Sequence, residues 1–504
     1  MPNEQILKAM STEGKMNRRI RSLMDMKEMV ALVAGVACLL SADAMQPSSD
    51  EAKASWLEED ISPEIGTCVA GYGVHDVSVE KLDPILASML AVEYEGRRCA
   101  LVSLDLLGID APVLREMRRG VASILDVPEA YVMITCTHTH GGPHARMLNE
   151  GEARMKLHYT LDGDPPAGLN VPYLKELRAK LYAMAKKIKD GPWRTVRIGF
   201  HSSQVDMNSN RRFTTADNCA SFVAHRRLLQ KIATGIADKE FGIVALFEVT
   251  NCAPLYVIGN YAAHPLAAHG PGTGGLRISS DFPGYFRRYV KSETGADAMF
   301  VQGACGDLIP KDDELGRNAA QRIGESLAEA AMASVIDIQR NSGRYIFSKP
   351  AISAEIRSMR TRILERHRKH FDDVALGLDI QCLSIGEVAF VGVPGEIVNE
   401  VGLEMKWHSP FKRTFIAYCA TDYMGYISPA SFLAAGGYEP QSQRFPSRDV
   451  LRLVSLAADT LSCLHEESFP TVGGGEDRYP DNLELPIVNL PGGLKWSKRS
   501  TPNK

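Results

Sequence analysis

Three histidines within seven residues follow directly on a short apolar run, and this constrains the chain more than any other feature of its sequence. Residues 131–135 read as a buried strand, and His138, His140 and His144 come after it. In an extended segment, residues two apart project to the same face, so His138 and His140 are expected to point together at one ion or one substrate atom. The alternative is a polar turn whose histidines only face water.

Another histidine lies far downstream, after a second set of predicted strands. Residues 243–249 and 256–258 are rich in β-branched and aromatic side chains, which predicts paired strands, and His264 follows them at a strand-to-loop junction. Taken alone, a histidine before a proline is more often packed or hydrogen-bonded than a ligand. Together with His138 and His140, however, His264 supplies the third nitrogen that a zinc site needs.

The remaining sequence predicts an α/β fold, with mixed β-sheets flanked by helices. Residues 100–106 and 298–301 read as buried strands that lead into turns containing Gly or Asp. Helical spacing covers residues 112–125, 173–187, 282–294 and 318–333. The sequence has no internal repeat and no glycine motif of the nucleotide-binding kinds, which argues against nucleotide chemistry.

Taken in order along the chain, these segments resemble the neutral/alkaline non-lysosomal ceramidases, a family of zinc-dependent amide hydrolases. The resemblance covers most of residues 65–445. It is carried by the Thr-His-Thr-His-Gly-Gly-Pro run at 137–143, by the Ala-His-Pro and Pro-Gly-Glu runs at 263–265 and 394–396, by segments 102–105, 210–212, 278–281 and 302–307, and by two tyrosines twelve residues apart, Tyr426 and Tyr438. It implies a single interwoven catalytic domain like that of neutral ceramidase.

The resemblance implies that a zinc ion is held by His138, His264, Glu396 and Tyr426. Two imidazoles, a carboxylate and a weakly bound phenol leave room for a water molecule. Zinc lowers the pKa of such a water from about 15.7 to about 7, so that hydroxide is available at neutral pH to attack an acyl carbon.

Three further residues match family positions at the substrate site. His140 is expected to carry a proton or to polarise the carbonyl, because an imidazole titrates in the working pH range. Tyr438 and Arg211 are expected to line the site, where Tyr438 could stabilise an oxyanion and Arg211 could hold a carboxylate or a polar head group.

One position departs from the family pattern. Ile309 stands where ceramidases carry a serine once proposed as the nucleophile, which excludes an acyl-serine mechanism there. The change also removes a hydrogen-bonding group beside the reacting carbonyl. The leading prediction is hydrolysis of an amide of a ceramide-like lipid by zinc-activated water. The alternatives are a small non-lipid amide, ester or lactone as the substrate, and a non-catalytic zinc- or lipid-binding relative.

The candidate ligands extend from His138 to Tyr426, which predicts one catalytic domain over residues 60–470, with a Pro- and Gly-punctuated tail at 471–504 that is too short for another domain. A net charge of −4 argues against a nucleic-acid partner. The basic clusters at 360–362 and 366–370 are expected to be solvated helix faces. The predicted partner is a lipid or small acyl substrate, with peripheral contact with a membrane surface as a further possibility, and the oligomeric state is left open.

The amino-terminal segment, residues 1–50, has the outline of a leader. Basic residues at 16–21 precede an apolar run at 29–40 and an Ala-x-Ala pattern at 42–44, which favours a signal peptide and hence a secreted, periplasmic or cell-surface protein. A cytoplasmic protein with an amphipathic amino-terminal helix is the alternative. The apolar run is short for a transmembrane helix.

Several polar residues and cysteines near the motifs have two interpretations. Asp105 and Asp281 could each orient a ligand histidine or cap a helix. The ten cysteines are scattered without a Cys-x-x-Cys pair, which indicates neither a zinc ribbon nor a disulfide framework. Cys136 and Cys305 lie within motif segments and are expected to be small buried residues rather than nucleophiles.

Overall fold

A computed structural model of the chain describes residues 51–72, 76–147, 156–214, 220–222, 235–269, 276–311, 315–373 and 375–470. The described residues up to Ser468 belong to one compact unit. The predicted leader at 1–50 and tail at 471–504 lie outside the described residues, as does the glycine-rich segment at 270–275.

The larger of two main sheets has eight strands and is mixed. Its parallel pairs are β11 with β13 and β4 with β5, and its other neighbours are antiparallel. The spatial order is β13 (Asp297–Gln302), β11 (Pro254–Tyr261), β10 (Glu240–Glu248), β6 (Arg194–Gln204), β1 (Ala52–Asp60), β3 (Leu86–Tyr94), β4 (Arg97–Leu104) and β5 (Val132–Cys136).

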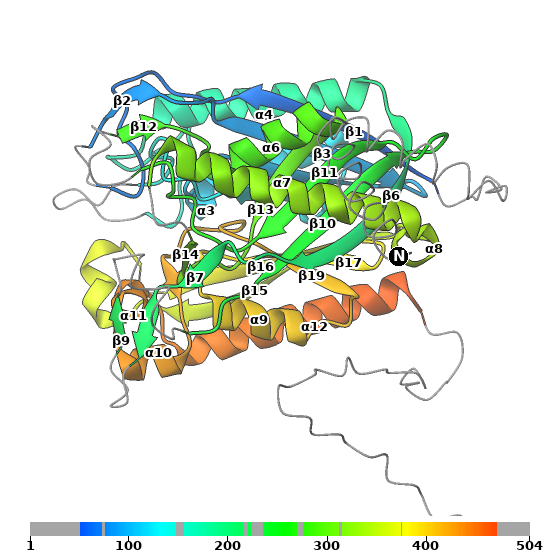
Figure 1. Cartoon of the computed structure of the whole chain (residues 1–504). Helices are drawn as coiled ribbons and strands as arrows, with labels where there is room; N and C mark the ends of the chain where they lie inside the picture. The colour runs from blue at the N-terminus through cyan, green and yellow to red at the C-terminus, as the bar shows by residue number, and fades with distance from the viewer. Residues whose placement is uncertain are drawn as a thin grey trace, which may run out of the picture. The chain divides into compact units, whose positions relative to one another are not determined.

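The second sheet has four strands, in the order β15 (Ile352–Arg362), β16 (Ala375–Ile385), β17 (Val388–Gly392) and β19 (Arg413–Ala417). Figure 1 shows the two sheets stacked between two helical layers. The helices over the larger sheet are α3 (Ala111–Leu125), α4 (Val171–Asp190), α6 (Asp281–Thr294) and α7 (Arg317–Arg340). Those over the smaller sheet are α9 (Asn399–Trp407) and α12 (Arg448–Ser468).

Strand β10 shows why the layers stack in this way. Val244 and Leu246 belong to the core between the two sheets, whereas Ile243, Ala245 and Phe247 belong to the core beneath α6 and α7. Successive side chains of a strand point to opposite faces, so a strand covered on both faces reads as a continuous apolar run. The architecture confirms the predicted α/β fold of mixed sheets flanked by helices.

The predicted helices are all present, and α7 runs seven residues beyond its predicted end, to Arg340. One expectation is wrong: residues 360–362 lie at the end of strand β15 and not on a helix. Arg360 and Arg362 are exposed while Thr361 is buried, which is the two-residue alternation of a strand with one solvated face. The second basic cluster falls in a short 3₁₀ helix, η2 (Glu365–His370).

Four short two-stranded pairings tie the connecting loops together, and three of them bring candidate site segments side by side. They are β2 (Ser78–Lys81) with β12 (Leu276–Ile278), β7 (Asn208–Asn210) with β14 (Leu308–Pro310), β18 (Glu396–Ile397) with β20 (Tyr426–Ile427), and β8 (Arg212–Thr214) with β9 (Ala220–Phe222). The remaining short helices are η1 (Glu129–Tyr131), α8 (Ser342–Tyr345), α10 (Ala430–Ala435) and α11 (Tyr438–Ser442).

The carboxyl ends of strands from both sheets meet at one place. The amide of Cys136 at the end of β5 donates to the carbonyl of Tyr418, 3.3 Å away, and the Tyr418 amide donates to the carbonyl of Gln302 at the end of β13, 3.1 Å away. The amide of Gly303 donates in turn to the carbonyl of Tyr261 at the end of β11, at 2.9 Å. The loops that carry the candidate ligands therefore start from a shared, hydrogen-bonded base.

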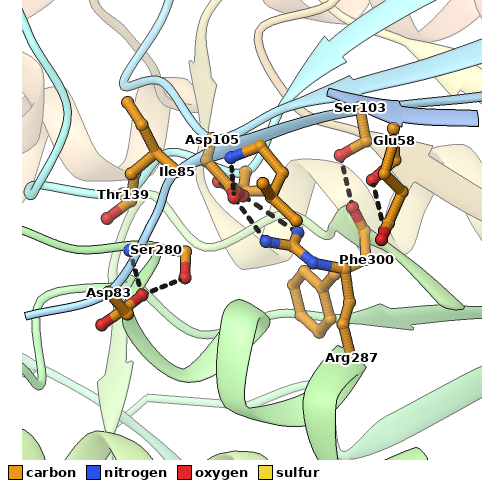
Figure 2. A network of polar contacts seen from close by, with 12 residues as sticks. Glu58, Asp83, Ile85, Ser103, Asp105, Thr139, Ser280, Arg287 and Phe300 are labelled. Carbon is orange, nitrogen blue, oxygen red and sulfur yellow. Dashed lines mark hydrogen bonds and ion pairs between the residues drawn. The ribbon is translucent and has the colours of Figure 1, made fainter. Parts of the chain in front are cut away.

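A buried ion pair fixes α6 against the end of β4 (Figure 2). Arg287 of α6 donates through both terminal nitrogens to Asp105, with an Nη1–Oδ1 distance of 3.1 Å. The carboxylate also accepts hydrogen bonds from the Leu86 amide at 2.8 Å and from the Thr137 hydroxyl at 3.1 Å. Asp105 therefore neither orients a ligand histidine nor caps a helix, and both sequence-based alternatives for it are wrong.

Asp281 begins α6 in the left-handed backbone region, with a φ of 56°. Its carboxylate accepts a hydrogen bond from the amide of Phe282 in the first turn and another from the amide of Ala268, each 2.7 Å long. The capping interpretation is thus the closer one. The carboxylate also ties the loop after His264 to the start of the helix.

Within the described ranges, no helix has the length and apolar character that crossing a lipid bilayer requires.

Candidate metal centre

His138 lies in a loop and not in a strand. Strand β5 ends at Cys136, and His138 has a φ of 64°, in the left-handed region that residues other than glycine rarely adopt. A backbone hydrogen bond from its amide to the carbonyl of Leu106, 2.9 Å long, holds this conformation. The rings of His138 and His140 do come together, with centroids 5.4 Å apart. The predicted reason for this, the side-chain alternation of an extended segment, is wrong.

The rings of His138 and His264 are oriented by main-chain carbonyls. Nδ1 of His138 lies 2.7 Å from the carbonyl oxygen of Leu107, and Nδ1 of His264 lies 2.7 Å from that of Cys305. Because a carbonyl oxygen only accepts hydrogen bonds, each Nδ1 carries the hydrogen, and each Nε2 of a neutral ring presents a lone pair. This arrangement fixes the tautomer that leaves Nε2 available to a metal ion.

Three electron-pair donors face one another at the centre of the cluster. The two Nε2 atoms are 3.2 Å apart, and Oε2 of Glu396 lies 3.3 Å from Nε2 of His138 and 3.5 Å from that of His264. Lone pairs and a carboxylate oxygen at such separations repel one another unless a cation lies between them. Ligands at about 2.0–2.2 Å from a tetrahedral zinc ion are roughly 3.3–3.6 Å apart, which is close to the separations of the three donors, so they fit such an ion.

Glu396 is placed by the β18–β20 pairing and held by a tyrosine. Glu396 pairs with Tyr426 in the β18–β20 register. The preceding Gly395 has a φ of 157° and passes so close to Gly425 that a Cβ on Gly395 would lie 2.5 Å from the Gly425 carbonyl oxygen. The Tyr423 hydroxyl donates a short hydrogen bond to Oε1 of Glu396, which leaves Oε2 to face the histidines. Burial alone would raise the pKa of Glu396, whereas positive charge on the side of His138 and His264, on the rings or on a cation between them, lowers that pKa well below its usual range.

His140 stands beside this trio rather than within it. Its ring centroid is 5.4 Å from that of His138 and 5.6 Å from that of His264, against 4.7 Å between the latter two, while nitrogens of all three rings lie within 4.8 Å of one another. Nε2 of His140 is buried and has no hydrogen-bond partner among the described residues. Burial, reinforced by His138 and His264, lowers the pKa of His140 well below its usual range, so the ring is a neutral proton acceptor.

Gly71 leaves the space that the His140 ring occupies. It has a φ of 88°, and a Cβ there would lie 2.3 Å from Nδ1 of His140. A Gly71→Ala variant is therefore expected to displace the ring and strain the loop, lowering kcat of any reaction at this site by about tenfold or more while zinc content stays unchanged. Zinc content and turnover measured on the same sample check this. A Gly66→Ala variant is the matched control, because Gly66 also has positive φ but no atom within 4 Å of its Cβ position.

The remaining predicted site residues form a second group next to the first. The Tyr426 hydroxyl accepts a hydrogen bond of 3.1 Å from Nη2 of Arg211, and the ring of Tyr438 stands edge-on to that of Tyr426 with centroids 5.3 Å apart. Arg211 also donates to Glu439 at 2.9 Å and to the Gly306 carbonyl at 2.7 Å. Its contacts thus position Tyr426. Ligation of zinc by Tyr426 and a substrate contact of Arg211 stay predictions.

Residues around Asp307 have structural partners. Asp307 accepts hydrogen bonds from the Asn399 amide and the Asn210 side chain, both 2.7 Å long, while Ile309 is buried in β14 opposite Ser209. Cys136 and Cys305 are fully buried, and burial raises the pKa of both thiols. The expectation that these cysteines are buried residues rather than nucleophiles agrees with this.

His144, the third histidine of the motif, is buried apart from the cluster. Burial lowers the pKa of His144 to about 4, and the charge of Arg146 acts in the same direction. Between about pH 6.5 and pH 4 the unfolded chain therefore takes up a proton that the folded chain does not. The free energy of unfolding falls as the pH is lowered through this range. Over this range the wild type is expected to lose up to about 3 kcal/mol more than His144→Gln, as measured by urea unfolding. Equal pH dependence in both proteins would contradict the expectation.

Sequence reasoning missed two side chains of the site. Tyr423 lies three residues before Tyr426, but only the folded chain shows that it, rather than Tyr426, donates to Glu396. Arg146 lies just past the histidine motif, with its guanidinium carbon 4.3 Å from the centre of the Tyr423 ring. A basic residue that closely follows a histidine motif was the available signal for the second.

Comparison with known proteins identifies the fold. No protein-family model matches the sequence, and no curated protein matches it. Among solved structures, the neutral ceramidase from Pseudomonas aeruginosa superimposes with a TM-score of 0.64 at 15% sequence identity, over 85% of this chain and 76% of that one. A ceramidase complexed with C2 superimposes with a TM-score of 0.62 at 15% identity, over 84% of this chain and 77% of that one. The chain therefore has a ceramidase-like fold, with a buried histidine cluster that could bind a metal ion.

Proposed function

We propose that this protein is a zinc-dependent hydrolase of the neutral ceramidase family that cleaves an N-acyl amide bond with water. The observation that carries the proposal is the set of three facing donors, the Nε2 atoms of His138 and His264 and Oε2 of Glu396, at separations of 3.2–3.5 Å. Ceramidase-like architecture over 85% of the chain supports the same reaction class.

Each residue has a role that follows from its contacts. When bound by His138, His264 and Glu396, with Tyr426 as the proposed fourth ligand, zinc supplies a Lewis acid that lowers the pKa of a bound water to about 7. His140 is neutral and has a free Nε2, so it accepts a proton as the acyl carbon is attacked and returns it to the departing nitrogen. Tyr438 is 49% exposed, and we assign its hydroxyl to the substrate side of the centre.

Tyr423 holds Glu396 in the orientation that the metal requires. Removing the hydroxyl in Tyr423→Phe leaves Oε1 of Glu396 without this donor, so zinc affinity is expected to fall by about ten- to a hundredfold. Competition with a calibrated zinc chelator measures the affinity directly. Tyr289→Phe on α6 is the control that should bind zinc like the wild type, and an unchanged affinity in Tyr423→Phe would contradict the role.

The acyl group is proposed to be lipid-like. Leu433 in α10 is 54% exposed, and α10 packs against α11, which begins at Tyr438, so apolar surface is available on the Tyr426 side of the centre. Such surface suits an acyl chain and could also contact a membrane. The buried Ile309 in place of the family serine favours, as the second candidate, an N-acyl substrate whose polar part differs from that of ceramide.

Hydrolysis assays of the purified, zinc-loaded protein test the proposal. The substrates are short- and long-chain ceramides and N-acyl amides with other polar groups, and the control is the chelated protein. We expect release of the fatty acid that disappears on chelation, and we expect His140→Ala to retain zinc but lose turnover by about a hundredfold or more. A folded protein that holds zinc and cleaves none of these amides would instead be a non-catalytic zinc- or lipid-binding relative.

A further inference from the structure

Arg146 is a cation beside the metal centre, in contact with Tyr423, and it forms no ion pair with a carboxylate among the described residues. Its Nε is buried and has no hydrogen-bond partner. The structure shows one close contact for its guanidinium, the face of the Tyr423 ring, 4.3 Å from the guanidinium carbon to the ring centre.

This contrasts with three arginines whose side chains are buried. Arg118 pairs with Glu129 at 2.8 Å, Arg211 pairs with Glu439 at 2.9 Å, and Arg287 pairs with Asp105. Arg146 is partly buried, and its cation–π contact with Tyr423 uses the face of the guanidinium and not its N–H groups. The guanidinium of Arg146 therefore retains most of its capacity to bind an anion.

The position of Arg146 suits contact with a part of the substrate that lies away from the reacting bond. Tyr423 donates to Glu396, and its ring is stacked with that of His138, with centroids 6.4 Å apart and planes at 14°. Arg146 is thus separated from the proposed zinc ligands by one aromatic ring. A group bound there would lie beside the centre while the scissile bond lies at it.

Asp110 and Glu396 are the carboxyls whose charge acts on Arg146, and neither forms an ion pair with it among the described residues. Oδ2 of Asp110 accepts a hydrogen bond of 2.6 Å from the Met147 amide, and Oδ1 of Asp422 accepts from the amides of Ala111 and Tyr423 at 2.8 and 2.7 Å. Burial raises the pKa of both carboxyls, that of Asp422 to about 7. A second cation, Arg444, donates to the Tyr423 carbonyl at 3.4 Å, and burial together with the charge of Arg146 lowers the pKa of Arg444.

We infer that the amide substrate carries a carboxylate that Arg146 binds, so that the enzyme acts on N-acyl amino acids or similarly acidic amides. The inference rests on the proposed hydrolase function and specifies its substrate. A guanidinium offers a planar pair of donors that matches a carboxylate, and hydrogen bonds to charged partners are the stronger ones. Arg211, the arginine expected from the sequence to hold such a group, is already bonded to Glu439.

Two matched substrates test the inference: N-lauroylglycine, which ends in a carboxylate, and N-lauroylglycinamide, which has the same shape without the charge. We expect kcat/KM of the zinc-loaded wild type, measured as lauric acid release, to favour the acid by about ten- to a hundredfold. Arg146→Ala should remove this preference by lowering only the value for the acid, and Arg146→Lys should keep part of it. A monoamide of a dicarboxylic acid and its neutral diamide place the charge on the acyl side instead.

A control variant separates specificity from general damage. Arg344→Ala on α8 removes an exposed guanidinium that also lies over a tyrosine, 5.4 Å from the Tyr345 ring centre, and should leave the preference intact. Equal kcat/KM for acid and neutral partner in both pairs would overturn the inference. So would an equal loss on both substrates in folded Arg146→Ala and Arg146→Lys, because that result indicates support of Tyr423 rather than contact with substrate.

A binding experiment distinguishes failure of the inference from failure of the proposed function. His140→Ala protein, which is expected not to turn over, is titrated with N-lauroylglycine and N-lauroylglycinamide by calorimetry. Tighter binding of the acid that is lost on adding Arg146→Ala supports the inference even if the wild type hydrolyses neither compound. Equal affinity for both compounds contradicts it even if the wild type proves to be an amide hydrolase.

Discussion

Replacing His138 with alanine is expected to abolish zinc retention and hydrolysis together. Its Nε2 is one of three donors within 3.2–3.5 Å of one another, and two donors at this centre cannot hold the ion as three do. Even partners outside a metal's ligand set are commonly worth ten- to a hundredfold in affinity, so loss of a ligand should cost more than about a hundredfold. Zinc per chain after dialysis, measured by mass spectrometry, reports the effect.

The control for this variant is another histidine on the same scaffold. His201 on β6 is partly buried and bonds to the Ser334 hydroxyl at 3.0 Å, away from the cluster, so His201→Ala should retain wild-type zinc content. If His138→Ala retained one zinc per chain and normal turnover, the assignment of the metal centre would be wrong.

Replacing Asp105 with asparagine is expected to destabilise the fold by about 3–5 kcal/mol, because Arg287 would be left as a buried cation without its counterion. The loss would also weaken the hydrogen bonds that join the start of β3 and the residue after β5 to the end of β4. The free energy of unfolding, from urea titrations, is the measurement.

Two further variants serve as controls for this experiment. The pair Lys291–Asp297 has the same charges and a distance of 2.7 Å, but the lysine side chain is 54% exposed, so Lys291→Ala should cost no more than about 1 kcal/mol. A double variant, Asp105→Asn with Arg287→Met, removes the buried cation and should recover part of the lost stability. If Asp105→Asn were no more destabilising than Lys291→Ala, the ion pair would not be the anchor between β4 and α6.

The sequence predicts local secondary structure in this protein better than it predicts which distant side chains pair with one another. Apolar runs and helical spacing locate β4, β5, β10, β13 and the four helices over the larger sheet, since each pattern depends on neighbours within a few residues. The pairing of Asp105 with Arg287 joins residues 182 positions apart, and no sequence motif around either residue predicts the other as its partner. Asp105 therefore reads equally well as an orienting group or a cap until the fold brings α6 to it.

The candidate site shows the same division. Local spacing draws attention to His138 and His140, but their convergence depends on a left-handed residue at 138 and on a hydrogen bond to Leu106, neither of which the pattern of an extended strand predicts. Glu396 was identified from family resemblance alone. Tyr423 was missed because its role depends on the direction of one hydroxyl, which spacing does not contain.

The central claim, that three facing donors hold a zinc ion used for amide hydrolysis, is tested most directly by titrating the metal-free protein with zinc. Fatty-acid release from N-lauroylglycine and from a short-chain ceramide is recorded after each addition. The account predicts that hydrolysis of at least one substrate rises with zinc, stops rising at one equivalent per chain, and does not rise in His138→Ala. Hydrolysis that is complete without zinc, or that responds to zinc equally in His138→Ala, would contradict it.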